Sequence, residues 1–308
     1  MPSLRWGLVG TGTWARAVHA PSLATAAGGG RLTAVWGRDP VRAGALAAEH
    51  GAATATSFEH LLDAVDAVSL AVAPDAQVAL ARRAVERGLP VLLEKPVATE
   101  VTAVQDLVRV MPEGSRAVVF LTRLFEPARS RWVREAARGS WTGAEVVHAS
   151  GALTAGSAYA GSLWRHGAGG LWDLLPHVLS QVVPVLGDVA DGTVGPWPEH
   201  DGFLVDLEHV GGATTRVRIS LTAVPEDREE WIRFDGPGGS TRSPADALDF
   251  VAAHAAAVQV VEGTTDPLHD PLLRMTTVEA ALAPTALIAD LVAQHEDAGR
   301  PTTTQHRQ

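Results

Sequence analysis

Short apolar runs alternate with amphipathic stretches along the first 121 residues of the chain. Strands are expected in five such runs, at residues 5–9, 32–36, 67–72, 91–93 and 117–121. The stretches between them have the length and periodicity of helices and cover residues 15–24, 40–50, 75–87 and 99–110, with Asp39, Asp75 and Thr99 as suitable N-caps. Unbroken apolar strands that alternate with helices are typical of a parallel sheet covered on both faces. The pattern therefore predicts a doubly wound α/β domain.

The hydrophobic period changes after about residue 122. A helix is expected near residues 127–138, then strand-like segments at residues 144–150, 203–209, 214–221 and 230–234, and a long helix near residues 278–295. In the third of these strands Val217, Ile219 and Leu221 alternate with polar side chains, which is typical of a half-exposed antiparallel strand. We therefore expect a first domain at residues 1–122, a second at residues 123–300 and a frayed tail at residues 301–308.

Length and composition agree with two domains and exclude several classes of protein. The chain has 308 residues, more than one typical core accommodates, and 46% of them are hydrophobic. Its net charge is −10 and it has no basic run, so a nucleic-acid partner is not expected. The arginines between Arg129 and Arg138 have mostly helical spacing and are interpreted as a solvated helix face.

No membrane segment or secretion signal is expected. No apolar stretch reaches the ~18 residues of a membrane helix, and the N-terminus leads into a strand pattern without the core of a signal peptide. The chain has no cysteine, which excludes disulfides and thiol chemistry. These features predict a cytoplasmic protein.

A glycine-rich turn follows the first predicted strand. Residues 7–15 read GLVGTGTWA, in which Gly10, Gly12 and Ala15 form a G-x-G-x-x-A pattern. Gly10 permits a tight turn, Gly12 lets the backbone approach a pyrophosphate, and Ala15 allows the helix to pack closely on the strand. Because the pattern ends a strand and opens a helix, it predicts a dinucleotide site of Rossmann type, whose turn also contains Thr11, Thr13 and Trp14.

Arg38 and Arg42 bear on the choice between NAD and NADP. An acidic side chain at the tip of the second strand binds the ribose of NAD, whereas an arginine there binds the extra phosphate of NADP. The tip reads AVWGRD at residues 34–39, and Asp39 is interpreted as the cap of the next helix. The two arginines favour NADP, because guanidinium matches phosphate in geometry. NAD remains the alternative, since arginines are common throughout this chain.

Lys95 is the only lysine among the 25 basic residues. It lies in Glu94-Lys95-Pro96 at the carboxyl end of a predicted strand, which is where ligands bind in α/β sheets. An ammonium group can shift its pKa and exchange protons, which a guanidinium does not do at ordinary pH. The alternative is a salt-bridged lysine on a surface loop, which both the position and the rarity of this lysine oppose.

A second glycine-rich turn leads into a predicted helix that carries Asp173 and His177. Residues 164–177 read WRHGAGGLWDLLPH. Asp173 and His177 are four residues apart and share one helix face, and Pro176 is expected in the first turn, where proline is tolerated. His177 can titrate near neutrality, and Asp173 can orient it or bind a substrate hydroxyl. The alternative is an aspartate at a helix N-terminus with an unrelated histidine.

In this order the three motifs resemble those of the Gfo/Idh/MocA oxidoreductases, the relatives of glucose–fructose oxidoreductase and inositol dehydrogenase. The sequence HAPSL at residues 19–23 and the segment Ala73-Pro74-Asp75 extend the resemblance. It implies an N-terminal Rossmann domain and a C-terminal α/β domain with an open, mostly antiparallel sheet. That sheet often serves in oligomerisation, so a homodimer or homotetramer is expected.

The resemblance also implies roles for particular residues. Lys95, Asp173 and His177 are expected to be catalytic and to line the substrate pocket, and the peptide before Pro96 is often cis in relatives. Further substrate contacts are expected from Trp164, Arg165 and His166, and further cofactor contacts from Ala73, Pro74 and Glu94.

Four departures from the family pattern leave the substrate open. Ala168 replaces one of the usual glycines, and Leu175 stands where a small residue usually separates Asp from His. The usual N-x-R-F-x-P is TRLFEP at residues 122–127, and Val78 occupies the place where many relatives have histidine.

The expected function is that of an NAD(P)-dependent oxidoreductase acting on a sugar, cyclitol or related polyhydroxylated small molecule. Hydride would pass between the nicotinamide and a secondary alcohol or ketone, while His177 exchanges the hydroxyl proton and Lys95 stabilises the oxygen. Proton transfer through Lys95 stays open as an alternative.

The sequence bears on three other classes of protein. A short-chain dehydrogenase needs Tyr-x-x-x-Lys, but the only tyrosine is Tyr159 and residue 163 is leucine. No metal site is expected, because the 12 histidines are scattered and cysteine is absent. The serious alternative is a non-catalytic dinucleotide-binding sensor or regulatory protein on the same fold.

Overall fold

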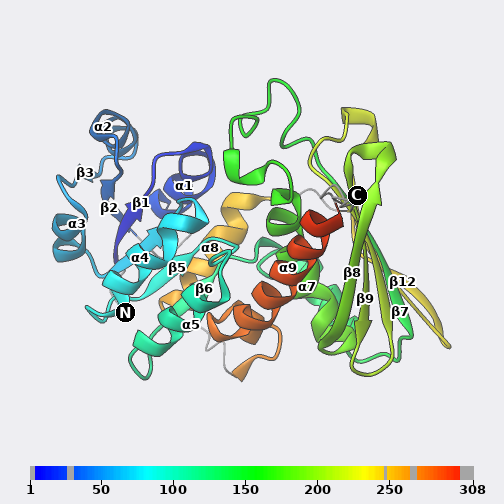
Figure 1. Ribbon diagram of the computed structural model, residues 1–308. Coiled ribbons are helices and arrows are strands. Elements are labelled where there is room, and N and C mark those ends of the chain that lie inside the picture. Colours follow the sequence, from blue (N-terminus) through cyan, green and yellow to red (C-terminus); the bar gives the residue numbers. More distant parts are fainter. Residues whose placement is uncertain (1–3, 26–30, 246–247, 264–268, 299–308) are drawn as a thin grey trace, which may run out of the picture.

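The computed structural model describes residues 4–25, 31–245, 248–263 and 269–298. Two six-stranded sheets organise the described chain, one in each half of the sequence. Figure 1 shows them at opposite ends of the molecule, with helices between them. The frayed tail predicted at residues 301–308 lies outside the described residues.

The first sheet is parallel throughout and has the order β3-β2-β1-β4-β5-β6. Its strands are β1 (Arg5–Val9), β2 (Arg31–Trp36), β3 (Ala53–Thr54), β4 (Ala67–Leu70), β5 (Val91–Leu93) and β6 (Ala117–Val119). Between them run a π-helical turn (Ala15–His19), α1 (Ala20–Ala24), α2 (Pro40–Glu49), α3 (Phe58–Ala64), α4 (Pro74–Val85) and α5 (Val101–Val110). This arrangement confirms the predicted doubly wound Rossmann sheet.

Local differences from the prediction have local causes. Strand β3 was not expected, because it has only two residues and both are exposed. Asp39 caps α2 as predicted, accepting hydrogen bonds from two backbone N–H groups of the first turn. The caps expected at Asp75 and Thr99 are wrong: α4 begins after Ala73, with Pro74 fixing its first turn, and α5 begins after Glu100.

The second sheet is mixed and has the order β12-β11-β7-β10-β9-β8. Its strands are β7 (Gly143–Ala149), β8 (Val189–Trp197), β9 (Gly202–His209), β10 (Thr214–Ser220), β11 (Glu229–Gly236) and β12 (Gly239–Arg242). All pairs are antiparallel except β10 with β7, so β10 is antiparallel on one side only. Its apolar face is buried as predicted, with Val217 and Ile219 fully covered. Strand β8 was missed because its glycines and proline obscure the alternation.

Helices α7 (Gly169–Leu186) and α9 (Leu282–Ala298) cover the face of this sheet that is turned toward the Rossmann half (Figure 1). Helix α6 (Pro127–Ala136) packs against α7, and its Arg129 is only 4% exposed. The prediction of a solvated arginine face is therefore wrong at Arg129, which reaches Gln181 and Glu230 in the interior. Helical spacing alone does not separate a buried arginine from an exposed one.

Pro176 lies inside α7 and not in its first turn as predicted, because the helix already begins at Gly169. A proline at this position has no N–H to donate, so the carbonyl of Trp172, four residues earlier, loses its helical partner. The helix nevertheless continues to Leu186 and delivers Asp173 and His177 to the space between the two halves.

Helix α8 (Phe250–Val261) belongs to the second half of the sequence but packs on the Rossmann sheet. Its buried residues share a core cluster with Trp6 and Leu8 of β1 and with Leu92 of β5. Figure 1 shows α8 beside β5 and β6, on the side of the Rossmann half that faces the rest of the molecule. The boundary near residue 122 stays a prediction, and α8 is a returning segment that it did not include.

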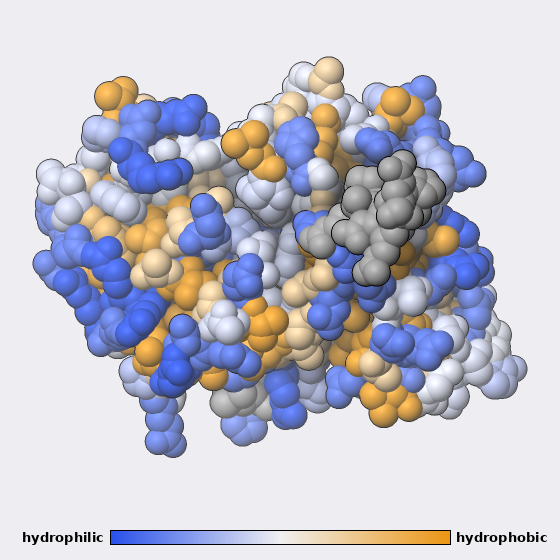
Figure 2. Space-filling model, in the orientation of Figure 1, coloured by the Kyte–Doolittle hydropathy of each residue, from blue (hydrophilic) through white to orange (hydrophobic). Residues whose placement is uncertain are grey.

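The surface is mixed in character. On the face drawn in Figure 2, hydrophilic side chains cover both halves, with small apolar groups scattered among them. Within the described ranges of the chain, no helix is long and apolar enough to cross a membrane.

Candidate active site

A cleft of about 650 Å³ opens where the carboxyl ends of β1, β4 and β5 face α7. The glycine turn follows β1, the segment through Pro74 follows β4, and Glu94 and Lys95 follow β5. From the second half, the side chains of Asp173 and His177 reach the same cleft. Carboxyl ends of parallel strands are where ligands bind in such sheets. The cleft therefore joins the three motifs that the sequence had placed far apart.

The glycine turn has the geometry that a dinucleotide requires. Gly10 has φ +117°, and a Cβ atom there would lie 2.2 Å from the carbonyl oxygen of Ala71, so only glycine fits. At Gly12 a Cβ atom would meet nothing within 4 Å, so the backbone borders open space. Ala15 is fully buried against the sheet. The residues present thus fit a pyrophosphate lying against the turn.

A second hollow of about 370 Å³ adjoins the turn and bears on cofactor choice. It is lined by Thr11, Gly12, Thr13, Arg16, Ala17 and Arg42. Arg42 also lines the main cleft, whereas Arg38 is exposed and lines neither space. Of the two predicted cationic residues, the structure places only Arg42 at the site.

Lys95 and Asp173 form a buried ion pair. The Nζ atom of Lys95 lies 2.6 Å from Oδ1 of Asp173 and donates a second hydrogen bond, of 2.8 Å, to the backbone carbonyl of the same residue. The other carboxylate oxygen of Asp173 accepts from Nε of Arg165 at 2.9 Å. Burial raises the pKa of Asp173, but the two cations and their hydrogen bonds outweigh burial and hold it well below its usual range. Asp173 therefore orients Lys95 and Arg165 and does not bond His177.

The His177 imidazole lies among positive charges. Burial lowers its pKa well below the ordinary value, and Lys95, His148 and Arg123 lower it further, against a smaller opposing effect of Asp173. Its Nδ1 is buried and has no hydrogen-bond partner within the described chain. The ring is therefore neutral at physiological pH and lines the cleft as a group able to accept a proton.

Arg165 is held from several sides, whereas His166 faces away. The Arg165 guanidinium lies 4.2 Å from the ring centre of Trp164 and 5.0 Å from that of Tyr159, and all three side chains line the cleft. His166 is exposed, contacts the carbonyl of Ala160 at 3.1 Å and does not line the cleft. The position of His166 in the sequence motif did not indicate that it lies outside the cleft while Arg165 lines it.

Sequence reasoning missed a group of residues beside His177. His148 on β7 and Arg123 line the cleft, and Glu230 on β11 accepts from Arg123. Burial raises the pKa of Glu230, but His148, Arg123 and Arg129 together lower it below the usual value. The only available signal was the alternation of β7, which places His148 on the face toward α7.

Sequence reasoning also missed Gln77, one residue before the Val78 that marks a lost family histidine. Gln77 is fully buried on α4. Its Nε2 lies 2.7 Å from the carbonyl of Glu94 and 3.1 Å from those of Pro96 and Val97, and its Oε1 accepts from the N–H of Glu94. The Lys95–Pro96 peptide is cis, as the family resemblance implied. One amide side chain thus fixes the loop that carries Lys95.

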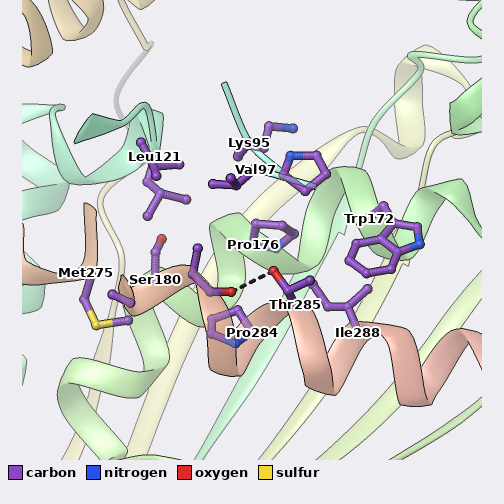
Figure 3. Close-up of a pocket in the computed structure, with 14 residues that line it drawn as sticks. Lys95, Val97, Leu121, Trp172, Pro176, Ser180, Met275, Pro284, Thr285 and Ile288 are labelled. Atoms are coloured by element: carbon purple, nitrogen blue, oxygen red, sulfur yellow. Dashed lines mark hydrogen bonds between the residues drawn. The ribbon is translucent and has the colours of Figure 1, made fainter. Parts of the chain in front are cut away.

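A small apolar cavity lies between α7 and α9, below this loop (Figure 3). Its volume is about 30 Å³, and Pro176, Trp172 and Ile288 are among its lining residues. A water molecule needs roughly 10–15 Å³ measured in this way, so the cavity has room for water but not for a sugar. The main cleft, at about 650 Å³, is therefore the candidate space for a substrate and a dinucleotide. Among the residues that the structure describes, no group of three or more acidic or histidine side chains is arranged to hold a metal ion.

The fold and the cleft are those of a Rossmann-type protein with a ligand cleft at the carboxyl edge of its parallel sheet. Residues 4–121 match the model of the Gfo/Idh/MocA oxidoreductase family with its NAD-binding Rossmann fold. This match agrees with the family that the motifs resemble.

Individual relatives agree with this assignment. The chain is 38% identical over 127 residues to inositol 2-dehydrogenase 2 of Saccharopolyspora erythraea, a match covering 40% of this chain and 37% of that relative. Its fold is similar to that of scyllo-inositol dehydrogenase from Lactobacillus casei, with a TM-score of 0.80, 15% identity and coverage of 96% and 97% of the two chains. It is also similar to an oxidoreductase from Agrobacterium radiobacter in complex with NAD+, L-tartaric acid and magnesium, with a TM-score of 0.72, 19% identity and coverage of 96% and 97%.

Proposed function

We propose that this protein is an NAD(P)-dependent dehydrogenase or reductase of a sugar, cyclitol or related polyhydroxylated small molecule. The observation that carries the proposal is the meeting of Lys95, Asp173 and His177 in one cleft with an open glycine turn. The curated inositol dehydrogenase supports the substrate class, although the match covers only 37% of its length.

The cofactor supplies or accepts the hydride when it is bound in the cleft. Gly10, Thr11, Gly12, Thr13 and Trp14 would hold its phosphates, and Ala73, Pro74 and Glu94 would border the part of the cofactor nearest Lys95.

Lys95 and His177 have different roles toward the reacting alcohol. Two hydrogens of the Lys95 ammonium are used by Asp173, so the third is free to bond the substrate oxygen. His177, held neutral by its surroundings, takes the hydroxyl proton in oxidation and returns it in reduction. Asp173 keeps the ammonium in place, which supplies the fixed positive charge that a developing alkoxide needs.

Arg42 supports NADP as the preferred cofactor. Its guanidinium lines the hollow beside the glycine turn; the nearby Asp39 caps α2 through Oδ1, and its Oδ2 lies 4.0 Å from Nε of Arg42. An arginine in this place pairs with the extra phosphate of NADP. We expect kcat/KM to be higher with NADP than with NAD, and Arg42→Ala to reverse or remove that preference. An unchanged ratio in the variant would refute this role.

The face of the second sheet away from α7 is where we place self-association. There the half-buried Trp197 and Trp231 pack over a small buried cluster of Val147, Ala149 and Ala223. We propose a homodimer or homotetramer through this face, which light scattering on purified protein tests. A monomer at micromolar concentration would contradict it. The cytoplasmic location stays a prediction, which cell fractionation tests.

The central test measures turnover and binding together. Consumption of NADPH and NADH is followed against a panel of keto-sugars and inososes, and cofactor binding is measured by calorimetry. The dehydrogenase predicts turnover with at least one member of the panel. Tight cofactor binding without turnover on any member would favour the non-catalytic sensor.

A further inference from the structure

Two buried histidines, one from each half of the chain, lie behind the cleft and have no part in the proposed mechanism. His19 follows the glycine turn, and His254 is on α8; both are fully buried. His254 Nε2 lies 3.0 Å from His19 Nδ1, and His254 Nδ1 lies 2.9 Å from the hydroxyl of Ser22. Buried polar groups are held in such networks only when each is satisfied, so this pair has a fixed arrangement.

The network ends on the carboxylate of Glu94. His19 Nε2 lies 2.9 Å from Oε1 of Glu94, and the indole N–H of Trp14 donates to the same oxygen at 2.7 Å. Both contacts within the described chain go to Oε1, which leaves Oε2 for a ligand in the cleft that Glu94 lines.

The hydrogen-bond directions follow from the carboxylate, which only accepts. His19 must carry its proton on Nε2 to donate to Glu94, so its Nδ1 accepts. His254 then donates from Nε2 to that Nδ1, which the hydroxyl of Ser69 on β4 also contacts at 2.8 Å, and the Nδ1 of His254 accepts from Ser22. Burial holds the pKa of His254 well below its ordinary value, which agrees with a neutral ring. The tautomer of each ring is therefore set by the hydrogen bonds that it makes with its neighbours.

Helix α8 also packs against Trp14, the other residue that donates a hydrogen bond to Glu94. Phe250 lies four residues before His254 and on the same helix face. Its ring packs edge-on against Trp14, with 5.1 Å between ring centres. The two donors to Glu94 are thus both held by α8, one through His254 and one through Phe250.

We propose that His254, acting through His19, is a positioning residue that orients the Glu94 carboxylate toward the cofactor. The returning helix α8 in this way completes a cofactor site whose other parts come from the first 121 residues. The inference rests on the cofactor role proposed for Glu94 and adds the residues that set its orientation.

The experiment compares His254 with another buried histidine. His209 is 3% exposed and also makes two hydrogen bonds, to the carbonyl of Gly187 and to Thr215, but it lies in the second sheet. The variants are His254→Leu, His254→Gln, which keeps a donor near the Nε2 position, and the control His209→Leu.

The first readout is the NMR resonance of the Trp14 indole N–H in protein without cofactor, assigned with Trp14→Phe. This proton bonds the carboxylate that the network orients. We expect His254→Leu to shift the resonance, His254→Gln to restore it, and His209→Leu to leave it in place. An unchanged resonance in folded His254→Leu, or an equal shift in the control, would overturn the proposal.

The second readout is the dissociation constant of NADPH by calorimetry. We expect a rise of about tenfold in His254→Leu and recovery to within about threefold in His254→Gln. If both variants bind as the wild type does, the proposal is wrong. Because the NMR readout involves neither substrate nor turnover, its failure is distinguishable from failure of the proposed enzymatic function.

A smaller substitution covers the case in which His254→Leu does not fold. Ser22→Ala removes only the hydroxyl that fixes the His254 tautomer, and Thr215→Val does the same for the control His209. We expect Ser22→Ala to shift the Trp14 resonance in the same direction as His254→Leu, by less, and Thr215→Val not to shift it. Equal resonances in Ser22→Ala and wild type would refute the relay.

Discussion

The ring of His177 is surrounded by Lys95, Arg123 and His148, and these neighbours decide how it titrates. Positive charge and burial both oppose adding a proton, so the residue acts as a base over a wider pH range than a histidine in water. Spacing on α7 predicted that His177 lies on the same face as Asp173, but not that the carboxylate would bond Lys95 instead.

This arrangement predicts the pH dependence of alcohol oxidation. Oxidation needs the unprotonated ring, and the lowered pKa keeps it unprotonated below the ordinary histidine value of about 6.5. We expect kcat/KM to stay constant as pH falls through that value and to decline only at lower pH. In Arg123→Met one of the lowering charges is lost, so the decline should begin at a higher pH. A wild-type decline centred at or above about 6.5 would contradict the assignment.

The hydrogen bonds of Gln77 predict a measurable loss of stability when this side chain is replaced. Replacing it by leucine leaves three carbonyls and one N–H of residues 94–97 without their buried partner. We expect a loss of about 3 kcal/mol in the free energy of unfolding, because each unsatisfied buried group costs about 1–3 kcal/mol and part of the loop relaxes. Denaturant titration measures this loss.

Turnover separates the Gln77 role from general stability. The loop carries Lys95, so kcat of Gln77→Leu should fall by about tenfold or more at a temperature where the variant is folded. The matched control is Thr285→Val, which removes the hydrogen bond from the Thr285 hydroxyl on α9 to the carbonyl of Ala281, just before that helix. Equal kcat values in the two variants would show that Gln77 does not position Lys95.

In the turn between β1 and the following helix, Gly10 and Gly12 are glycines for different physical reasons. Gly10 is required by the fold, since its φ is +117° and the carbonyl of Ala71 leaves no space for a Cβ atom. Gly12 is free of contacts, so the fold does not require it. A sequence pattern alone shows both as equal members of one motif.

Alanine substitutions test this difference. Gly10→Ala should destabilise the protein by about 3 kcal/mol, through backbone strain and overpacking together, and should also weaken cofactor binding. Gly12→Ala should leave the free energy of unfolding within about 0.5 kcal/mol and raise the cofactor dissociation constant by about tenfold. Denaturant titration and calorimetry measure the two effects. A stable Gly12→Ala protein with wild-type affinity would show that the cofactor does not approach this turn.

For the molecule as a whole, the sequence predicted most of the elements that follow from hydrophobic periodicity. It predicted few of the features that depend on contacts between distant parts of the chain. The strands of the parallel sheet and the three motifs follow from apolar runs and turn chemistry. The return of α8, the burial of Arg129 and the role of His19 depend on partners 50 or more residues away, and the role of Gln77 depends on partners 17 to 20 residues away. Local patterns contain no information on such partners.

Stability of the whole protein should depend on pH through its buried histidines. The pKa values of His148, His177 and His254 are all lowered in the folded state, chiefly by burial. Below about pH 6.5 the unfolded chain binds protons that the folded chain does not, so acid favours unfolding by about 1.4 kcal/mol per pH unit for each such histidine. We expect the free energy of unfolding from urea titrations to be lower at pH 5.5 than at pH 7.5. An equal or higher value at the lower pH would contradict the buried neutral state of these rings.

The action of Lys95 on the reacting oxygen is the central step of the proposed oxidoreductase mechanism. The most direct measurement is kcat of Lys95→Ala with the best substrate of the panel, taken together with the cofactor dissociation constant. We predict a fall in kcat of about 100-fold or more with cofactor affinity within about threefold of wild type, because the ammonium acts on the substrate and the glycine turn holds the phosphates. Turnover within a few-fold of wild type would contradict the mechanism.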